Sequence, residues 1–484
     1  MRPMNPTHNV IFIAIDALRA RNLGCYGYER HTSPHIDSLA SRGLLCENSF
    51  ACTNYTDPSF TTIFSGRYPL SHGILHHGPK VTDTEVRRFE QLNIMLLPEI
   101  LKENGYITLA IDWLWRWHKR GYDYYSGARG RTTLHGFIKQ QLRKFPVLRK
   151  VVGQYAVNKV GEKLFGGVSK SYEDAESVTS QAIELIKENR DKRFFLFLHY
   201  WDTHCPYLPP RAYVDNYNRT KEVMEELFGY FTSTRFEEQF DAFQEAALRS
   251  EQEIVASYDG EIAFVDHEIG RLLDFLEHNR MLNDALIVLT SDHGESLLEH
   301  GIYLDHHGLY DVTLQVPLII VHPQLPRGKR ASGFVQHFDI FPTMLDLLDI
   351  KANADIDGLS ILPLIDEQQL RSAVYSEEAQ WQRKRAIRTE KWKYIYALSE
   401  EGALCRRCGR THGPPEELYD LTDDPEETTN VLQREPQVAK DLRNQADRWA
   451  RKFDHTHVVD DEKGETYRED MEKVEERLRR LGYI

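Results

Sequence analysis

The sequence lacks an apolar run long enough to cross a membrane. No stretch of about 18 apolar residues occurs anywhere in the 484 residues, so no transmembrane helix is expected. The apolar run Val10–Ile15 lies near the start of the chain, but it is short and is soon followed by Asp16 and Arg19. Such a run is not typical of a secretory signal, and we therefore expect a cytoplasmic protein.

Cysteine is scarce, with six residues, which does not suggest a disulfide scaffold in a chain of this length. Cys405, Cys408 and His412 have the spacing of half a zinc knuckle, but the sequence offers no clear fourth ligand. A structural zinc site and a tight surface turn are both compatible with this segment, and the surface turn is the preferred interpretation.

Positive charge is in deficit, because 60 Lys and Arg residues face 74 Asp and Glu residues and leave a net charge of −14. Basic residues gather in the segment 113–170, which we interpret as a basic insert on an acidic body. No nucleic-acid-binding module is recognisable. Apolar and basic residues interleave over 137–152, a pattern typical of helices that lie on an anionic surface, either lipid headgroups or a polyanionic substrate. A lid docked on the acidic body or on a second subunit is the alternative, and a homo-oligomer is compatible with the sequence.

Apolar residues make up 41% of the chain, enough for a large core, and many of them gather in short runs. Five such runs predict buried strands, at 9–15, 107–111, 194–198, 285–289 and 316–321. Helical patterns alternate with these runs, notably over 175–188 and 251–279. This alternation predicts an α/β fold with a doubly wound, mostly parallel sheet flanked by helices.

The last quarter of the chain has a different pattern. Short alternating or aromatic segments at 373–377, 383–389 and 391–397 predict a small antiparallel sheet, and 418–425 reads as a turn-rich connection. We therefore expect a catalytic domain over 1–370 and a smaller C-terminal α+β subdomain over 371–484.

Ionisable residues follow three of the predicted strands: Asp16, His204 and the pair Asp292-His293. In open α/β sheets ligands bind beyond the carboxyl ends of the strands, so we expect these side chains to meet at one edge of the sheet.

The segment Thr56–Arg67 predicts a helix N-terminus beside that edge. Asp57 followed by Pro58 reads as an N-cap with proline at the first helical position, and Gly66 as the stop. Thr56 would then stand where backbone N–H groups and the helix dipole favour an anion. A hydroxyl in this place can attack a phosphorus or sulfur centre.

A divalent cation needs three or four hard or borderline ligands, such as carboxylate oxygens and imidazole nitrogens, and an open position for substrate. Asp16, Asp292 and His293 are the candidates, and the Thr56 oxygen would complete the set. Metal contact would lower the pKa of the Thr56 hydroxyl, which has no internal activation. We expect one Mn, Ca, Mg or Zn ion.

Several motifs together resemble the sulfatase branch of the alkaline phosphatase superfamily over nearly the whole chain apart from the basic insert. They are Ile15–Arg19, Thr32–Asp37, Pro58-Ser59 with Ser65–Pro69, Ser291–Glu295, His307–Tyr310 and Glu417–Leu421. The resemblance implies an alkaline-phosphatase-like fold and a metal-dependent ester hydrolase.

The departures from the family pattern bear on the chemistry. Typical sulfatases carry a Cys or Ser where this chain has Thr56, and oxidise it to formylglycine; the following arginine is Phe60 here. Threonine cannot give that aldehyde, and it resembles instead the family's phosphodiesterases, phosphatases and phospho-group transferases. The paired aspartates of the first strand are Asp16-Ala17, and His293 stands where many sulfatases have Asn.

The resemblance also implies roles for residues on other loops. His204 matches a substrate-contacting histidine, and Asp305-His306-His307 lies where the family places another basic substrate or leaving-group residue. Weaker candidates for binding an anion are Arg67 and Lys80. A second metal site is an alternative for the set Asp202, His204, His306 and His307.

Together these features predict a hydrolase of a small or polymeric anionic ester, preferably a phosphodiester or phosphonate-type ester. Thr56 would be the nucleophile, with His204 and His307 assisting. The alternatives are a sulfuric-ester hydrolase without formylglycine, a phospho-group transferase, and an inactive anion-binding relative.

Overall fold

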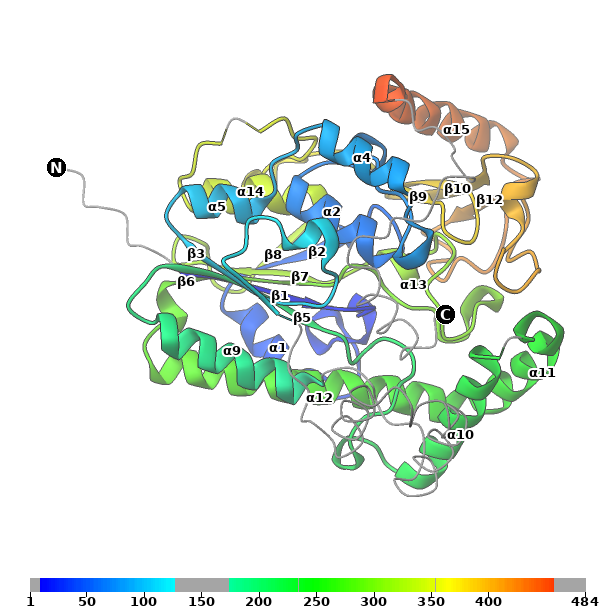
Figure 1. Cartoon of the computed structure of the whole chain (residues 1–484). Helices are drawn as coiled ribbons and strands as arrows, with labels where there is room; N and C mark the ends of the chain where they lie inside the picture. Colours follow the sequence, from blue (N-terminus) through cyan, green and yellow to red (C-terminus); the bar gives the residue numbers. More distant parts are fainter. Residues whose placement is uncertain (1–8, 127–173, 234, 353, 457–484) are drawn as a thin grey trace, which may run out of the picture.

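An eight-stranded sheet forms the centre of the molecule in this computed structural model, which describes residues 9–126, 174–233, 235–352 and 354–456 (Figure 1). The strand order is β4-β3-β5-β1-β6-β7-β2-β8, and β7 runs antiparallel to both of its neighbours while the other pairs are parallel. The strands are β1 (Asn9–Ile15), β2 (Leu44–Phe50), β3 (Ile107–Ile111), β4 (Tyr124–Ser126), β5 (Phe194–Tyr200), β6 (Ala285–Thr290), β7 (Leu318–Val321) and β8 (Lys329–Gln336). The predicted fold class is confirmed, and β2, β4 and β8 are additions to the five predicted strands.

Strand β1 is buried on both faces, and its alternate residues enter two different cores. Val10, Phe12 and Ala14 pack into the core with α2 (Thr56–Ser65), α4 (Asp83–Gln91), α5 (Leu97–Glu103) and α14 (Ile340–Leu347). Ile11, Ile13 and Ile15 pack into the core with α1 (Pro34–Ser41), α9 (Ala175–Asn189) and α12 (Glu251–His278). Figure 1 shows these two groups of helices on opposite faces of the sheet. The continuous apolar run of β1 is therefore the consequence of a helix layer on each side.

Further helices surround this body. The helices α10 (Tyr217–Phe231) and α11 (Phe236–Arg249) add side chains to the same core as α12, near its N-terminal end (Figure 1). Two short helices are α3 (Pro69–His72) and α13 (Asp311–Leu314). None of the helices in the described part of the chain combines the length and the apolarity that a membrane crossing needs.

A separate four-stranded antiparallel sheet forms near the C-terminus, in the order β12-β11-β10-β9. Its strands are β9 (Ala373–Glu378), β10 (Lys384–Thr389), β11 (Trp392–Ala397) and β12 (Glu416–Asp420). Helix α15 (Pro436–Ala450) packs against it through Ala439, Leu442 and Ala446. The expectation that 418–425 is only a turn-rich connection is wrong, because β12 takes up its first residues.

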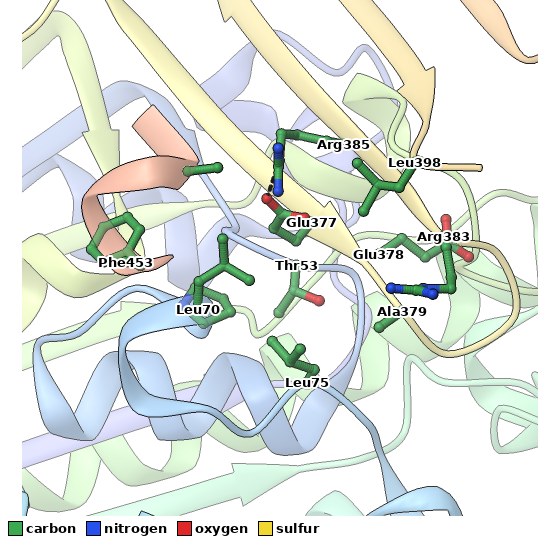
Figure 2. A pocket seen from close by; sticks show the side chains of 12 residues that line it. Thr53, Leu70, Leu75, Glu377, Glu378, Ala379, Arg383, Arg385, Leu398 and Phe453 are labelled. Atoms are coloured by element: carbon green, nitrogen blue, oxygen red, sulfur yellow. Dashed lines mark hydrogen bonds and ion pairs between the residues drawn. The ribbon is translucent and has the colours of Figure 1, made fainter. Parts of the chain in front are cut away.

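The small sheet is joined to the segment that leads into α2. Glu377 donates its backbone N–H to the carbonyl of Cys52 at 2.9 Å, and Ser376 Oγ donates to the carbonyl of Ala51 at 3.0 Å. Figure 2 shows a pocket at this junction, lined by Thr53 from one side and by Glu377 and Arg383 from the other. Strand β9 therefore borders the approach to α2 directly.

Only the first part of the predicted basic insert lies among the described residues. Residues 113–126 belong to the body of the catalytic fold, and Trp113, Leu114 and Trp117 are in its core. The described first part of the predicted insert thus packs with the catalytic fold, and the bounds of the insert stay a prediction. Residues 127–170, including the interleaved stretch 137–152, lie outside the described residues, so the surface-binding interpretation stays a prediction.

Candidate active site

Helix α2 is buried along its whole length, although six of its ten residues are polar. It satisfies them locally: Thr61 Oγ1 donates to the carbonyl of Asp57 at 2.7 Å, and Thr62 Oγ1 to that of Pro58 at 2.8 Å. Gly66, with φ of +66°, ends the helix in the left-handed conformation as predicted. Thr56 is the first residue of the helix, so that its side chain lies at the buried N-terminus.

Asp57 is not the N-cap that the sequence suggested, because it lies inside the first turn and the cap position belongs to Tyr55. Its carboxylate instead contacts the Arg116 guanidinium, His77 Nδ1 at 2.9 Å and His118 Nε2 at 3.0 Å. Burial alone would raise the pKa of Asp57, but Arg116 and the two imidazoles hold it well below its usual range. Asp57 therefore anchors the start of α2 as a buried anion.

The start of α2 offers fewer N–H donors than expected. The N–H of Asp57 lies 3.4 Å from His77 Nδ1, Pro58 has none, and the N–H of Ser59 bonds to the carbonyl of Tyr55 at 3.1 Å. The Ser59 bond is the ordinary first i→i−4 bond of an α-helix, so only the N–H groups ahead of Ser59 belong to the unpaired first turn. Because Pro58 lacks an N–H, the first turn of α2 has fewer donors than most helices, and the helix dipole adds to the field of the N–H groups that remain.

Asp16, Asp292 and His293 converge from the carboxyl ends of β1 and β6, and their ligand atoms lie within 4.8 Å of one another. His293 Nε2 lies 3.3 Å from Asp292 Oδ2 and 3.7 Å from Asp16 Oδ1. Thr56 Oγ1 lies 3.4 Å from the same His293 nitrogen. The structure thus brings together the four residues that the sequence grouped as one site, with all four side chains buried.

The donor set in this cluster fits a divalent cation. Asp16 Oδ1 and Asp292 Oδ2 are buried and accept no hydrogen bond from the described residues, which is costly for carboxylates unless another group meets them. Asp292 Oδ1 is already engaged by the backbone N–H of Ala17 at 3.2 Å and that of His293 at 3.0 Å. The Nδ1 of His293 lies 2.8 Å from the carbonyl of Gly294, which leaves Nε2 as the ligand atom.

Backbone strain accompanies this arrangement at Ala17. Its φ of +54° lies in the left-handed region, which a residue with a Cβ rarely adopts. The unusual turn directs the Ala17 N–H at Asp292 Oδ1. Ala17 therefore orients a neighbouring carboxylate through its backbone.

His199 supports Asp16 from behind, a contact that the sequence analysis missed. Its Nε2 lies 3.2 Å from Asp16 Oδ2, and its Nδ1 lies 2.8 Å from Asp112 Oδ1. Burial would lower the pKa of His199, but the two carboxylates raise it to about 10, so both ring nitrogens carry protons. The resulting Asp16–His199–Asp112 chain fixes the orientation of Asp16.

His204 and His306 lie beside the cluster. The ring of His306 stacks on that of His293 with centroids 4.1 Å apart, and the ring of His204 lies 5.3 Å from His306. Burial lowers the pKa of His204 to about 4, and burial together with His293 holds that of His306 well below its usual value. Both imidazoles are therefore neutral near neutral pH.

Three other predicted residues have their contacts elsewhere. His307 faces Cys405 and His412, so the suggested second-metal set of Asp202, His204, His306 and His307 does not converge. Arg67 binds Asp355 at the far end of α2. Lys80 donates to the carbonyl of Gln380 at 2.9 Å and lies over the Trp381 ring. These contacts give no support to a role for Arg67 or Lys80 in binding the substrate.

Two missed residues could have been found from the sequence, His199 after the predicted strand 194–198 and Asp112. Asp112 directly follows the predicted strand 107–111, so the strand-end argument that selected Asp16 applies to it as well. Arg116 had a weaker signal, because its neighbours made it look like part of a solvated basic segment.

Comparison with known proteins matches the chain to sulfatases. The family described as "Sulfatase" matches residues 8–350, and the C-terminal family of N-sulphoglucosamine sulphohydrolase matches residues 298–452. A sulfatase of Formosa agariphila is 26% identical over 87% of this chain and 82% of its own length. An N-acetylglucosamine-6-O-sulfatase of Bacteroides thetaiotaomicron is 22% identical over 88% and 82%.

Solved structures share the fold. One, determined with its substrate D-glucosamine-2-N,6-O-disulfate, has a TM-score of 0.68 at 20% identity and covers 94% of this chain and 99% of its own. The phosphonate monoester hydrolase of Agrobacterium radiobacter has a TM-score of 0.66 at 21% identity, with coverage of 92% and 96%. At these identities the likeness concerns the fold alone.

Proposed function

This chain belongs to the sulfatase family of the alkaline phosphatase-like superfamily, and we propose that it cleaves phosphoesters, of the diester or phosphonate type, through Thr56. The observation that carries the proposal is the position of Thr56 Oγ1, 3.4 Å from His293 Nε2 and at the buried start of α2. Family members are generally metal-dependent hydrolases, and the proposal concerns the ester class and the nucleophile.

The chemistry of threonine argues for a phosphoryl group. A formylglycine hydrate has two hydroxyls, so the second can expel a bound sulfate by C–O cleavage. A threonine ester has no such exit, and its intermediate must be broken by attack at phosphorus or sulfur. Sulfate esters carry less charge on the transferred group, so electrostatic stabilisation by the site should contribute less for them.

Asp16, Asp292, His293 and Thr56 would hold one divalent cation, of Mn, Ca, Mg or Zn. When bound, such an ion stabilises negative charge on the oxygens of the transferred group. His199 keeps Asp16 oriented and ionised through its 3.2 Å contact. The dipole of α2 adds a favourable field for the anionic ester at Thr56.

In the proposed reaction Thr56 Oγ1 forms a bond to phosphorus while the bond to the leaving alcohol breaks. Water, or an acceptor alcohol, then attacks phosphorus and releases Thr56. A neutral imidazole can accept the Thr56 proton and return it to the leaving oxygen. His204 and His306 are neutral and lie beside His293, so they are the candidates for this transfer.

A sulfuric-ester hydrolase with an unmodified threonine is the second candidate. The relatives described above are named sulfatases, and one structural relative was solved with a sulfated sugar as its substrate. Both candidates use the same cluster, and they differ in which ester reacts faster relative to its uncatalysed rate.

Matched aryl esters test the proposal. The purified full-length chain, supplied with Mn²⁺, is assayed on aryl sulfate, aryl phosphate, a phosphodiester and a phosphonate monoester, and each rate is divided by its background rate. We expect the largest ratio for the diester or the phosphonate, and an intact mass that shows unmodified threonine. A larger ratio for aryl sulfate would overturn the phosphoester proposal. Asp292→Asn serves as the control for contaminating hydrolases.

A further inference from the structure

Four potential soft-metal ligands meet in a second cluster, outside the Asp16 site. His307 lies on the loop after β6, whereas Cys405, Cys408 and His412 lie on the loop between β11 and β12. All four side chains are buried, with residue exposures of 4%, 0%, 2% and 5% in that order. The surface turn preferred from the sequence is therefore wrong in one respect, because both sulfur atoms belong to buried residues.

The distances suit a tetrahedral site. Cys405 Sγ lies 3.9 Å from His307 Nε2, and Cys408 Sγ lies 3.0 Å from His412 Nε2. The ligand atoms of His307, Cys405 and His412 all lie within 4.8 Å of one another. Zinc bonded at about 2.3 Å to sulfur and about 2.0 Å to nitrogen places its ligand atoms about 3.3 to 3.8 Å apart. Cys408 lies outside this group of three and adjoins it through His412, so a shift of the Cys408 side chain would complete the coordination.

The loop carrying the two cysteines has a tightly held backbone. Gly409 donates its N–H to the carbonyl of Cys405 at 3.0 Å, and Cys405 donates to the carbonyl of Arg410 at 2.8 Å. Gly409 has φ of +67°, and a Cβ there would lie 2.2 Å from Glu237 Oε1. Glycine thus permits the sharp turn that brings Cys408 and His412 back beside Cys405.

Groups around the cluster orient the ligands. Asp305 Oδ1 lies 3.3 Å from His307 Nδ1, the nitrogen that faces away from Cys405. The other oxygen of Asp305 accepts a hydrogen bond from Arg407 Nη1 at 2.8 Å. In the sequence, Arg407 lies between Cys405 and Cys408. A carboxylate behind a histidine ligand is the usual arrangement at protein zinc sites. Lys384 Nζ holds the carbonyl of His412 at 3.0 Å.

We propose that His307, Cys405, Cys408 and His412 bind one Zn²⁺ ion as a closed structural site. The two thiols lose their protons to solvent on binding, and the two thiolates balance the charge of the ion. Four protein ligands leave no open position, so this ion takes no part in ester cleavage. The assignment also makes His307 a ligand instead of the catalytic residue expected from the sequence.

The proposed site would tie the loop of His306 to the C-terminal subdomain. His306 immediately precedes His307, and its ring stacks on His293 at 4.1 Å. Fixing His307 on the cysteine loop therefore limits the freedom of His306 beside the candidate active site. The proposal does not depend on which ester the enzyme cleaves.

Metal analysis of the purified full-length chain tests the proposal. We expect about one tightly held zinc per chain in the wild type and in Asp292→Asn, which separates this ion from any metal at the Asp16 site. Cys405→Ser and Cys408→Ser should each lose that zinc, and His307→Ala should reduce it. Cys46→Ser is the matched control, because Cys46 is also a buried thiol but lies in the core of the main sheet. This control should retain the zinc.

Two measurements on the wild type keep the proposal testable if the variants fail to fold. A mercurial reagent should release about one zinc per chain, detected with a chromogenic chelator. Exchange for Co²⁺ should give the thiolate-to-cobalt charge-transfer absorption. Absence of tightly bound zinc in the wild type, or an intact mass two hydrogens lighter from a Cys405–Cys408 disulfide in freshly purified protein, would overturn the assignment.

Discussion

Arg116 and Asp57 form an ion pair in which neither side chain is exposed to solvent. This pair holds the start of α2, one residue after Thr56. The other end of the helix is held by Arg67 and Asp355, where the Asp355 side chain is 91% exposed. The two arginines therefore provide a matched comparison between a buried and an exposed anchor of one helix.

Replacing Arg116 should destabilise the protein far more than replacing Arg67. Arg116→Met leaves the buried Asp57 carboxylate without its main partner, and we expect the free energy of unfolding to fall by about 3 to 5 kcal/mol. Arg67→Met removes a pair whose acid is solvated and should cost no more than about 1 kcal/mol. Urea unfolding followed by circular dichroism measures both, and equal effects would contradict the role assigned to Asp57.

Thr56→Ala should lower kcat by several orders of magnitude, because an activated nucleophile is lost. Thr56→Ser keeps the hydroxyl and should retain part of the activity. Thr62→Ser is the control, since Thr62 lies on the same buried helix with its hydroxyl bonded to the carbonyl of Pro58. Steady-state assays on the phosphodiester decide the matter, and full activity in Thr56→Ala would show that another group is the nucleophile.

Removal of metal should abolish turnover. Asp16 and Asp292 supply the carboxylates of the cluster, so Asp16→Asn and Asp292→Asn should each lose most of the metal bound there. The exposed Asp423→Asn should keep it. Elemental analysis after chelator treatment, with activity measured on the same samples, tests this expectation. Fully active enzyme without any metal would contradict it.

His199→Gln should weaken metal binding at the Asp16 site about 10- to 100-fold, because Asp16 loses the imidazolium that orients it. Asp112→Asn leaves His199 in place and should have a smaller effect. Calorimetric titration with Mn²⁺ gives the dissociation constant independently of activity. An unchanged constant in His199→Gln would mean that Asp16 is held by its other contacts.

Acid should destabilise the protein in part through His72, which is buried beside Thr62 in α2. Burial, with a contribution from Arg67, lowers its pKa in the folded protein from 6.5 to about 3. The stability that the neutral His72 ring provides is therefore fully present above the pKa that His72 has in the unfolded protein. It is lost as the pH falls toward the lower pKa that His72 has in the folded protein.

From this shift we expect His72 to account for about 2 kcal/mol of the stability lost between about pH 7 and about pH 5. Urea unfolding of His72→Gln across this range should show a shallower decline than the wild type. His278→Gln, at an exposed position on α12, should follow the wild type. Parallel curves for all three proteins would exclude this contribution of His72.

Local patterns predicted much of the fold and of the candidate site. Strand β1 could be predicted because burial on two faces needs a continuous apolar sequence. Asp16 could be placed because it directly follows that strand, at the edge of the sheet where ligands bind. The place of Thr56 at a helix start could be predicted because Pro58 marks the start of the helix and Gly66 its end. The capping residue was assigned incorrectly. The predicted domain boundary near residue 370 and the cytoplasmic location stay predictions.

Contacts between side chains that are far apart in the sequence could not be predicted. His307 and Cys405 are 98 positions apart, and nothing in either segment indicates the other. Arg116 belongs to a basic stretch, and a basic stretch is usually solvated, so its burial against Asp57 needed the tertiary structure. His199 directly follows the predicted strand 194–198, but nothing in that segment indicates that its two carboxylate neighbours, Asp16 and Asp112, follow two other strands.

The backbone hydrogen bond between Glu377 and Cys52 joins the C-terminal sheet to the segment that leads into α2, like a wall beside the candidate active site. Glu377 comes from β9, and Cys52 lies four positions before the proposed nucleophile. A fragment that stopped near residue 370 would leave the Cys52 carbonyl, and the chain leading into α2, without that wall. The two sheets differ in architecture, yet we expect that the larger one alone does not form an active hydrolase.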